Sequence, residues 1–228
     1  MSVSQNLLIV DPATRVAETE CFDAIAERAM GLIPSYHLPA IQDMSSLTSQ
    51  ETPAGIIVLG SGASVYDDLP WQAPLHAWTR AQMLSGVPTL GICYGHQMIA
   101  HIFGAPVELL WDGHKEKGAR QVTAASSRLG LEEATGPLAV SHREGVVECP
   151  DNFSVFAWSD DVTIDGIEHA TLPVWGVQPH VEAVDGFLKN NGIAVPNPDK
   201  TFRYGYRFID AFLALVMNRQ SSANTAHS

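Results

Sequence analysis

Residues 87–104, VPTLGICYGHQMIAHIFG, pass from an apolar stretch into a segment with the spacing of a helix. We predict a buried strand over residues 87–92 and a helix over residues 96–103 that ends at Gly104. A sharp turn between two such elements lifts the Cys93 side chain out of the sheet and places it at the helix N-terminus. The partial positive charge of that terminus favours a thiolate. The stretch therefore predicts a nucleophile elbow, with cysteine in the usual place of serine.

Most free cysteines are small buried hydrophobic residues rather than nucleophiles. Cys21 lies in an amphipathic, helix-like run and Cys149 lies near a predicted strand end, so we interpret both as structural. Cys93 differs because Gly91 and Gly95 flank it, and small residues at these positions let the backbone turn tightly. We therefore assign the nucleophile to Cys93.

A base for this nucleophile lies near the other end of the chain, where residues 174–182 read VWGVQPHVE. His180 and Glu182 follow an apolar strand two positions apart, so in extended backbone both side chains project to the same side. A histidine base oriented by a carboxylate completes a triad with a nucleophile. A His-x-Glu pair alone is common on protein surfaces, and only the elbow at Cys93 makes this one specific. We give His96 a supporting role, since one base is sufficient.

These motifs resemble the signatures of class I glutamine amidotransferases, which carry Gly-x-Cys-x-Gly-x-Gln and, later, Gly-Val-Gln-x-His-x-Glu. Two further stretches match in the same order. Residues 60–62, GSG, follow the apolar run 55–59 and resemble the family's oxyanion loop. Residues 141–144, SHRE, resemble the Ser-His-x-Asp element beside the bound glutamine. The resemblance extends from residue 7 to residue 182.

The resemblance implies a role for each matching residue. Cys93 is the expected nucleophile, His180 the general base and then acid, and Glu182 the residue that orients His180. Backbone amides at residues 60 and 94 are expected to bind the oxyanion, and residues 97, 141 and 142 the amino-acid end of the substrate. The substrate-binding residues that the resemblance implies are Gly60, Ser61, Gly62, Tyr94, Gln97, Ser141 and His142.

The chain departs from the family pattern around the histidine. Pro179 and Val181 stand where the family usually has an aromatic residue and a proline. Pro179 removes one amide donor and restricts Gln178 to extended backbone. We therefore expect the details of the substrate to differ from those of the family, while the three triad residues are retained.

Length and composition agree with one α/β domain. The chain has 228 residues, with 25 Asp and Glu against 13 Lys and Arg and a formal net charge of −12. This excess of acid argues against nucleic acid or an anionic membrane as a partner. Three cysteines and nine histidines form neither a disulfide framework nor a metal-ligand spacing, so we expect no metal and no cofactor. With no signal-peptide pattern at the start, and no apolar run near the ~20 residues that span a bilayer, we expect a cytoplasmic protein.

Apolar strand candidates alternate with helical segments, which predicts a mostly parallel central sheet flanked by helices, with short antiparallel edge strands. The resemblance implies the flavodoxin-like version of this fold. We expect one domain over residues 1–220 and a flexible tail over residues 221–228. The predicted strands are residues 7–10, 35–41, 55–59, 87–92, 107–110, 120–124, 138–141, 155–158, 163–169 and 174–178. The predicted helices are residues 16–30, 73–85 (with Ala77, Trp78, Ala81 and Leu84 inward), 96–103 and 200–217, and residues 112–120 are predicted to be a solvated loop that can wall the active site.

The expected reaction is hydrolysis of the γ-carboxamide of glutamine, or of an N-substituted γ-glutamyl amide, through a γ-glutamyl thioester. Two other functions stay open: a glutaminase subunit that delivers ammonia to a separate synthetase, and a non-catalytic binding protein on the same fold. No phosphate-cradling glycine-rich loop with a lysine is present, so nothing in the sequence resembles a nucleotide-binding synthetase. Either a separate partner supplies that half-reaction or the chain is a free-standing hydrolase of γ-glutamyl compounds, and we favour the hydrolase. Tyr66 and Trp71 are predicted to line the rim of its pocket.

Overall fold

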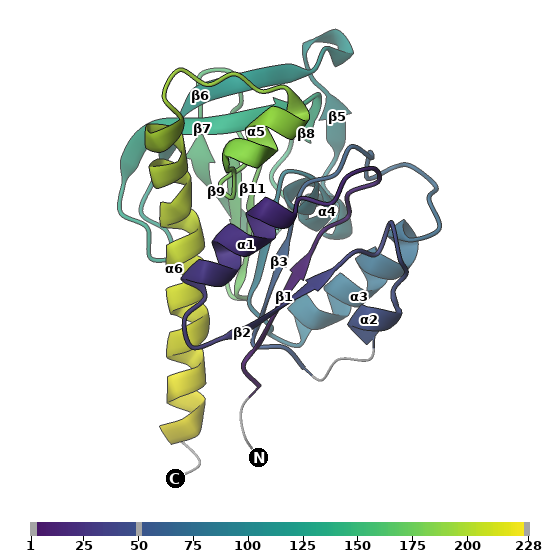
Figure 1. Cartoon of the computed structure of the whole chain (residues 1–228), viewed down its shortest axis with the longest axis vertical. Helices are drawn as coiled ribbons and strands as arrows, with labels where there is room; N and C mark the ends of the chain where they lie inside the picture. The colour runs from purple at the N-terminus through teal and green to yellow at the C-terminus, as the bar shows by residue number, and fades with distance from the viewer. Residues whose placement is uncertain (1–3, 49–51, 226–228) are drawn as a thin grey trace.

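The computed structural model describes residues 4–48 and 52–225 of the chain, and Figure 1 shows how its elements are arranged. The strands are β1 (Asn6–Val10), β2 (Ile33–His37), β3 (Gly55–Val58), β4 (Thr89–Ile92), β5 (Val107–Leu109), β6 (Glu116–Ala124), β7 (Ala134–His142), β8 (Glu144–Val146), β9 (Phe153–Trp158), β10 (Gly166–His169) and β11 (Val174–Val177). The helices are α1 (Thr19–Arg28), α2 (Ser45–Thr48), α3 (Gln72–Leu84), α4 (Tyr94–Ile102), α5 (Asp185–Asn191) and α6 (Pro198–Thr225), with a short 3-10 helix at Trp111–Gly113.

The main sheet changes from parallel to antiparallel across its width. Its strand order within the described residues is β2-β1-β3-β4-β11-β10-β9-β6-β7. The strands β2, β1, β3, β4 and β11 pair in parallel. From β11 onward, β10, β9, β6 and β7 pair antiparallel, and β5 and β8 form a small separate antiparallel sheet. This arrangement confirms the predicted α/β fold with a mostly parallel centre and antiparallel edge strands.

Alternating side chains of the central strands fill two cores, one on each face of the sheet. Leu7 and Ile9 of β1 pack in the same core as residues of α1 and α6. Leu8 and Val10 point the other way, into a core that includes residues of α3 and α4. Figure 1 shows α6 and α1 towards the left of the central strands and α3 towards the right. Both faces are therefore covered, which explains why the central strands read as continuous apolar runs.

Helix α3 turns a different face to the core from the one predicted. Its buried residues include Gln72 and Thr79, whereas Ala77 and Leu84 are exposed and Trp78 is partly buried. The prediction followed apolar periodicity alone, but Gln72 is drawn inward by hydrogen bonds to the Ser64 carbonyl and the Tyr94 hydroxyl. A polar residue with buried partners can therefore replace an apolar one on the core side of a helix.

Other boundaries also differ from the predictions. The stretch 112–120 is only partly a loop, because β6 begins at Glu116. Strand β2 ends at His37 rather than at residue 41. Helix α6 continues to Thr225, so residues 221–225 of the predicted tail are helical, and residues 226–228 lie outside the described residues. No helix in the part of the chain that the structure describes is long and apolar enough to traverse a lipid bilayer.

Candidate active site

The turn from β4 into α4 has the strand-turn-helix geometry predicted around Cys93. Cys93 has φ 52° and ψ −101°, in the region that non-glycine residues rarely adopt, and its amide donates a 2.9 Å hydrogen bond to the Val177 carbonyl. A Cβ atom at Gly95 would lie 2.3 Å from the Val58 carbonyl oxygen, and one at Gly91 would lie 2.3 Å from the Gly95 carbonyl oxygen. These backbone contacts explain both glycines: the first turn of α4 packs directly on β3 and β4.

His180 and Glu182 meet Cys93 from the end of β11. The His180 Nδ1 atom lies 2.9 Å from Glu182 Oε1, and the Cys93 and His180 side chains line the same cavity. The Phe187 ring lies 4.4 Å from the imidazole, centroid to centroid. The His180 amide donates to the Ala139 carbonyl at 2.8 Å, which ties the loop after β11 to β7. All three polar side chains are at least 95 % buried, with His180 the most exposed of them at 5 %.

The surroundings of His180 stabilise its protonated form. Burial by itself lowers the pKa of a histidine, because desolvation penalises the charged ring. The neighbouring Cys93 and Glu182 side chains outweigh that effect and raise the pKa of His180 to about 10. His96, by contrast, is fully buried against Gly176, and burial lowers its pKa to about 3. The ring that can hold a proton beside Cys93 is therefore that of His180.

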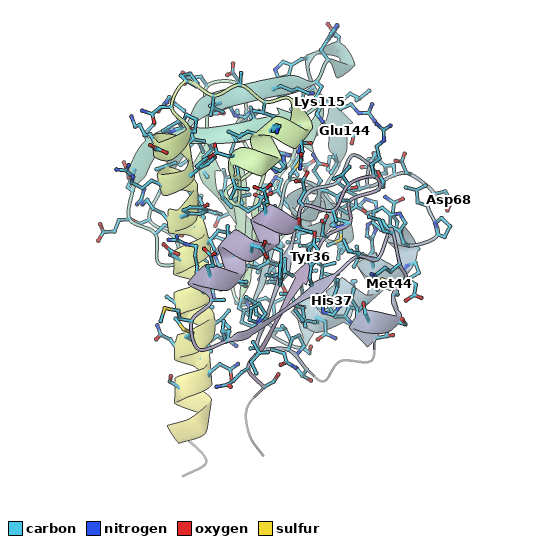
Figure 2. All side chains as sticks on the ribbon, in the orientation of Figure 1. Tyr36, His37, Met44, Asp68, Lys115 and Glu144 are labelled. Carbon is cyan, nitrogen blue, oxygen red and sulfur yellow. The ribbon has the colours of Figure 1, made fainter. Side chains whose placement is uncertain are left out.

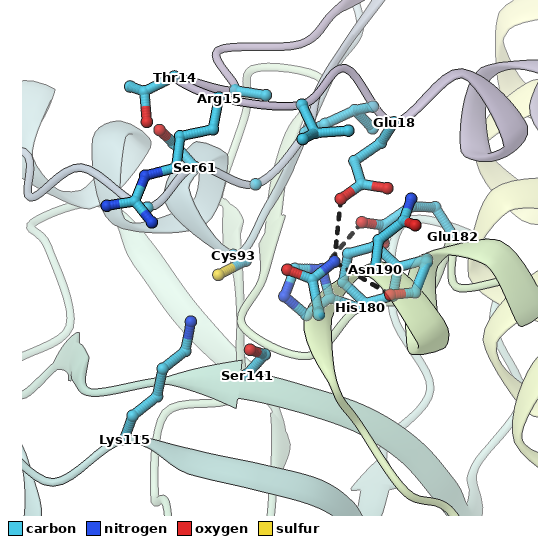
Figure 3. A pocket seen from close by; sticks show the side chains of 17 residues that line it. Thr14, Arg15, Glu18, Ser61, Cys93, Lys115, Ser141, His180, Glu182 and Asn190 are labelled. Carbon is cyan, nitrogen blue, oxygen red and sulfur yellow. Dashed lines mark hydrogen bonds and ion pairs between the residues drawn. The ribbon is translucent and has the colours of Figure 1, made fainter.

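Cys93, His180 and Glu182 line one cavity of about 400 Å³. Figure 3 shows the labelled side chains around it, with Cys93 and His180 near its centre. Lys115 lines it too, within the stretch 112–120 that was predicted to wall the site. Other lining residues were not predicted from the sequence, and they come from the loop after β1 and from α5: Arg15, Glu18, Phe187, Asn190 and Asn191.

One residue in the sequence, Asp11, indicates that the loop after β1 reaches the cavity. Asp11 directly follows the first parallel strand, at the edge of the sheet where ligands of α/β proteins bind. Its carboxylate is fully buried and accepts hydrogen bonds of 2.9 Å from the amides of Ala13 and Glu18 and another from the Tyr36 hydroxyl. Asp11 thus fixes the loop that carries Glu18 to the cavity.

Comparison with known proteins identifies the family. Residues 28–193 match the family model described as glutamine amidotransferase class-I. The chain belongs to this family. The match covers the elbow and the segment with His180 and Glu182, and it confirms the resemblance inferred from the motifs.

The class I amidotransferase chain is similar to proteins named as GMP synthases. It is 31 % identical over 172 residues to a glutamine-hydrolyzing GMP synthase of Thermosynechococcus vestitus, covering 75 % of this chain and 29 % of that protein. It is 38 % identical over 104 residues to one subunit of the glutamine-hydrolyzing GMP synthase of Methanopyrus kandleri, covering 44 % of this chain and 54 % of that protein. The chain thus spans less than two thirds of the length of both relatives.

Solved structures share the fold of this amidotransferase. A putative GMP synthase subunit from Thermoplasma acidophilum superposes with a TM-score of 0.72 at 20 % identity, covering 98 % of this chain and 100 % of that chain. A glutamine amidotransferase from Thermotoga maritima gives a TM-score of 0.69 at 16 % identity, covering 94 % and 97 %. At these identities the likeness establishes the fold.

The loop after β3 in this amidotransferase lies beside Cys93 and His180. A Cβ atom at Gly60 would lie 2.9 Å from His180 Cε1, so a side chain at residue 60 would displace the imidazole. Gly60, Ser61 and Gly62 line the cavity together with Cys93. The Ser61 hydroxyl donates to the Pro12 carbonyl at 2.8 Å, so it fixes the loop.

The residues expected to hold the amino-acid end line a smaller cavity of about 120 Å³ that opens beside Cys93. Gln97 Nε2 donates to the Glu144 carbonyl at 2.7 Å, and His142 Nδ1 lies 2.9 Å from the same oxygen. Lys115 and Glu144, which are labelled in Figure 2, line this cavity as well. The buried Ser141 hydroxyl, which lines both cavities, has no hydrogen-bond partner among the described residues and is free to meet a ligand.

Two predicted features of the pocket rim are wrong. Trp71 is 9 % exposed and packs on Tyr94, with ring centroids 5.7 Å apart, and Tyr66 accepts a 3.1 Å hydrogen bond from the Val107 amide. Neither residue lines either cavity that contains Cys93. Tyr94 follows the nucleophile as predicted, but its side chain points away from the site, with its hydroxyl 2.8 Å from His76 Nε2.

Within the described residues, no group of three His, Cys, Asp or Glu side chains is placed to hold a metal ion.

The elbow contact predicts the effect of one methyl group. Gly95→Ala should lower the free energy of unfolding by at least about 1 kcal/mol in urea denaturation, since overpacking against backbone exceeds the helix-propensity gain of alanine. Gly62→Ala is the control, because a Cβ atom there meets nothing within 4 Å. Equal stability of the two variants would contradict the proposed packing.

Proposed function

We propose that this chain hydrolyses the γ-carboxamide of glutamine or of an N-substituted γ-glutamyl amide through a thioester on Cys93. The observation that carries the proposal is that Cys93 and His180 line one cavity together, with His180 hydrogen-bonded to Glu182. A nucleophile, a base and an orienting group in this order are the parts of nucleophilic acyl transfer. Membership in the class I amidotransferase family supports the same reaction.

In the first half-reaction, the Cys93 sulfur attacks the γ-carbonyl carbon of the substrate. The amides of Gly60 and Tyr94 hold the developing oxyanion. His180 donates its proton to the leaving nitrogen, the C–N bond breaks, and ammonia or an amine departs while the γ-glutamyl group stays on sulfur. The raised pKa of His180 suits this donor role, and Glu182 keeps the ring in position.

In the second half-reaction, water attacks the thioester carbon and His180 accepts the water proton. The C–S bond breaks, glutamate leaves and the Cys93 thiolate returns. The smaller cavity supplies cationic groups, Lys115 and Arg143, for the α-carboxylate of the γ-glutamyl part. Neither half-reaction requires an oxidant, a metal or a cofactor.

The size of the larger cavity favours substituted amides. Its volume is about 400 Å³, within the range of about 300–1,000 Å³ that ligand pockets span. Even with part of the γ-glutamyl group inside, the cavity leaves room for an organic amine beyond the scissile bond. This supports a hydrolase that acts alone.

A second candidate function rests on the named relatives. Both are named as GMP synthases, and the Methanopyrus protein is one subunit of that enzyme. By analogy, this chain would release ammonia to a separate synthetase partner. The triad would then be the same, but turnover would depend on the partner closing the site.

Substitutions separate the roles in the triad. Cys93→Ala should abolish hydrolysis, and His180→Asn should cost nearly as much, by analogy with triads where single losses reach about 10⁶-fold in kcat. Glu182→Gln should retain more activity, because it orients the base without transferring a proton. Steady-state kcat/KM measures each effect, and Cys149→Ser, outside both cavities, is the control. An inactive His142→Asn variant beside a normal His180→Asn variant would mean that the base is misassigned.

The purified chain alone separates the two candidate functions. We expect it to hydrolyse at least one γ-glutamyl amide of an organic amine with a higher kcat/KM than glutamine. Tyr66→Ala should leave that ratio unchanged, because Tyr66 lies outside the cavity. Hydrolysis of glutamine that appears only after a synthetase is added would instead support the second candidate function.

A further inference from the structure

The larger cavity has two chemically different ends. Arg15 and Lys115 lie on the Cys93 side, whereas Glu18, Glu182 and Asn190 lie beyond His180 (Figure 3). In the proposed reaction, the leaving nitrogen must meet His180 to receive its proton. The rest of the leaving amine therefore extends from His180 towards the acidic end.

Only one of the two carboxylate oxygens of Glu182 has a hydrogen-bond partner among the described residues. Its Oε1 atom is bonded to His180, but Oε2 is buried and has no hydrogen-bond partner within the described residues. The side chain is 2 % exposed and lines the cavity. A buried carboxylate oxygen without a donor is costly, so this position favours a ligand that brings one.

Glu18 adds a second carboxylate whose partners are neutral. It accepts a 2.9 Å hydrogen bond from Asn191 Nδ2. In the described part of the chain, neither Glu18 nor Glu182 forms an ion pair with Lys or Arg. Burial, with smaller contributions from Asp11 and Glu182, raises the pKa of Glu18. A cation at this end would relieve the repulsion between these carboxylates.

We propose that the preferred substrate is the γ-glutamyl amide of a diamine, whose second, protonated amino group binds between Glu18 and Glu182. This inference rests on the proposed function and names the class of amine that the hydrolase releases. The ammonium donates to Glu182 Oε2 and to Glu18, which has acceptor capacity left beside its bond from Asn191. An ammonium that loses part of its hydration here gains charge-assisted hydrogen bonds.

Three γ-glutamyl amides of similar length test the proposal on the unmodified chain: the aminobutyl, pentyl and carboxypropyl amides. We expect kcat/KM for the aminobutyl amide to exceed that for the pentyl amide by about tenfold or more, with the carboxypropyl amide lowest. Free diaminobutane should likewise inhibit at lower concentration than pentylamine. Equal kcat/KM values for the aminobutyl and pentyl amides would overturn the inference and leave the proposed hydrolysis standing. Hydrolysis of glutamine but of none of the three amides would overturn the inference, and failure of the isolated chain to hydrolyse any γ-glutamyl amide, glutamine included, would overturn the free-standing hydrolase.

A matched pair of variants locates the effect. Glu18→Gln should reduce the aminobutyl-to-pentyl ratio of kcat/KM by about tenfold, because it removes the charge but keeps the shape. Glu20→Gln is the control: it makes the same change two residues later, outside the cavity, and should keep the wild-type ratio. Thermal unfolding establishes that both variants are folded. An unchanged ratio in folded Glu18→Gln would contradict the proposed role of Glu18.

Discussion

The site depends on one close backbone contact, that between Gly95 in the first turn of α4 and Val58 at the end of β3. The contact leaves no space for a side chain at residue 95 and fixes how sharply the chain turns after β4. Cys93 lies in that turn with a positive φ, which the neighbouring elements must stabilise. The same compact turn places the sulfur in the cavity and the N-terminus of α4 behind it. The need for glycine at residue 95 and the position of the Cys93 sulfur therefore follow from the same tight turn.

The rest of the site is attached to this turn from both sides. The Cys93 amide bonds Val177, so the strand that ends near His180 is fixed relative to the elbow. Arg120, buried in β6, forms ion pairs with Glu116 and Asp165, and the Asp165 carbonyl accepts a hydrogen bond from the Gln178 amide. The antiparallel half of the sheet thus supports the loop with His180. Removing one member of such a buried pair leaves an uncompensated charge, so this support is sensitive to substitution.

The sequence predicted those parts of the molecule that depend on local pattern. Spacing within a few residues was enough to predict three features: the elbow around Cys93, the His180–Glu182 pair and the alternation of strands and helices. The start of β6 was missed because Glu116 and Arg120 look like loop residues until their buried partners are known. The expected face of α3 was also wrong: Leu75 and Met83 face the core instead, and hydrogen bonds hold Gln72 on the same side.

The acidic end of the cavity was not predictable in the same way. Glu18 and Asn191 are 173 positions apart in the chain and meet only in the folded structure. Tyr66 and Trp71 were expected at the rim because they follow the GSG loop, but Trp71 is buried against Tyr94 just before α3, and the Tyr66 hydroxyl bonds the Val107 amide. Nearness in sequence to a catalytic loop was therefore a poor guide, whereas Asp11, at the end of a parallel strand, was an informative signal that apolar periodicity alone does not reveal.

The central claim is that the turn after β4 makes Cys93 the acyl carrier of an amide hydrolase. Its most direct test is acid quenching of the chain during turnover of a γ-glutamyl amide, followed by peptide mapping with mass spectrometry. The account predicts a γ-glutamyl group on the peptide that contains Cys93, released by hydroxylamine and absent from Cys21 and Cys149. An active preparation that carries the group on another residue, or shows no acyl-enzyme when hydrolysis of the thioester is the slow step, would contradict it.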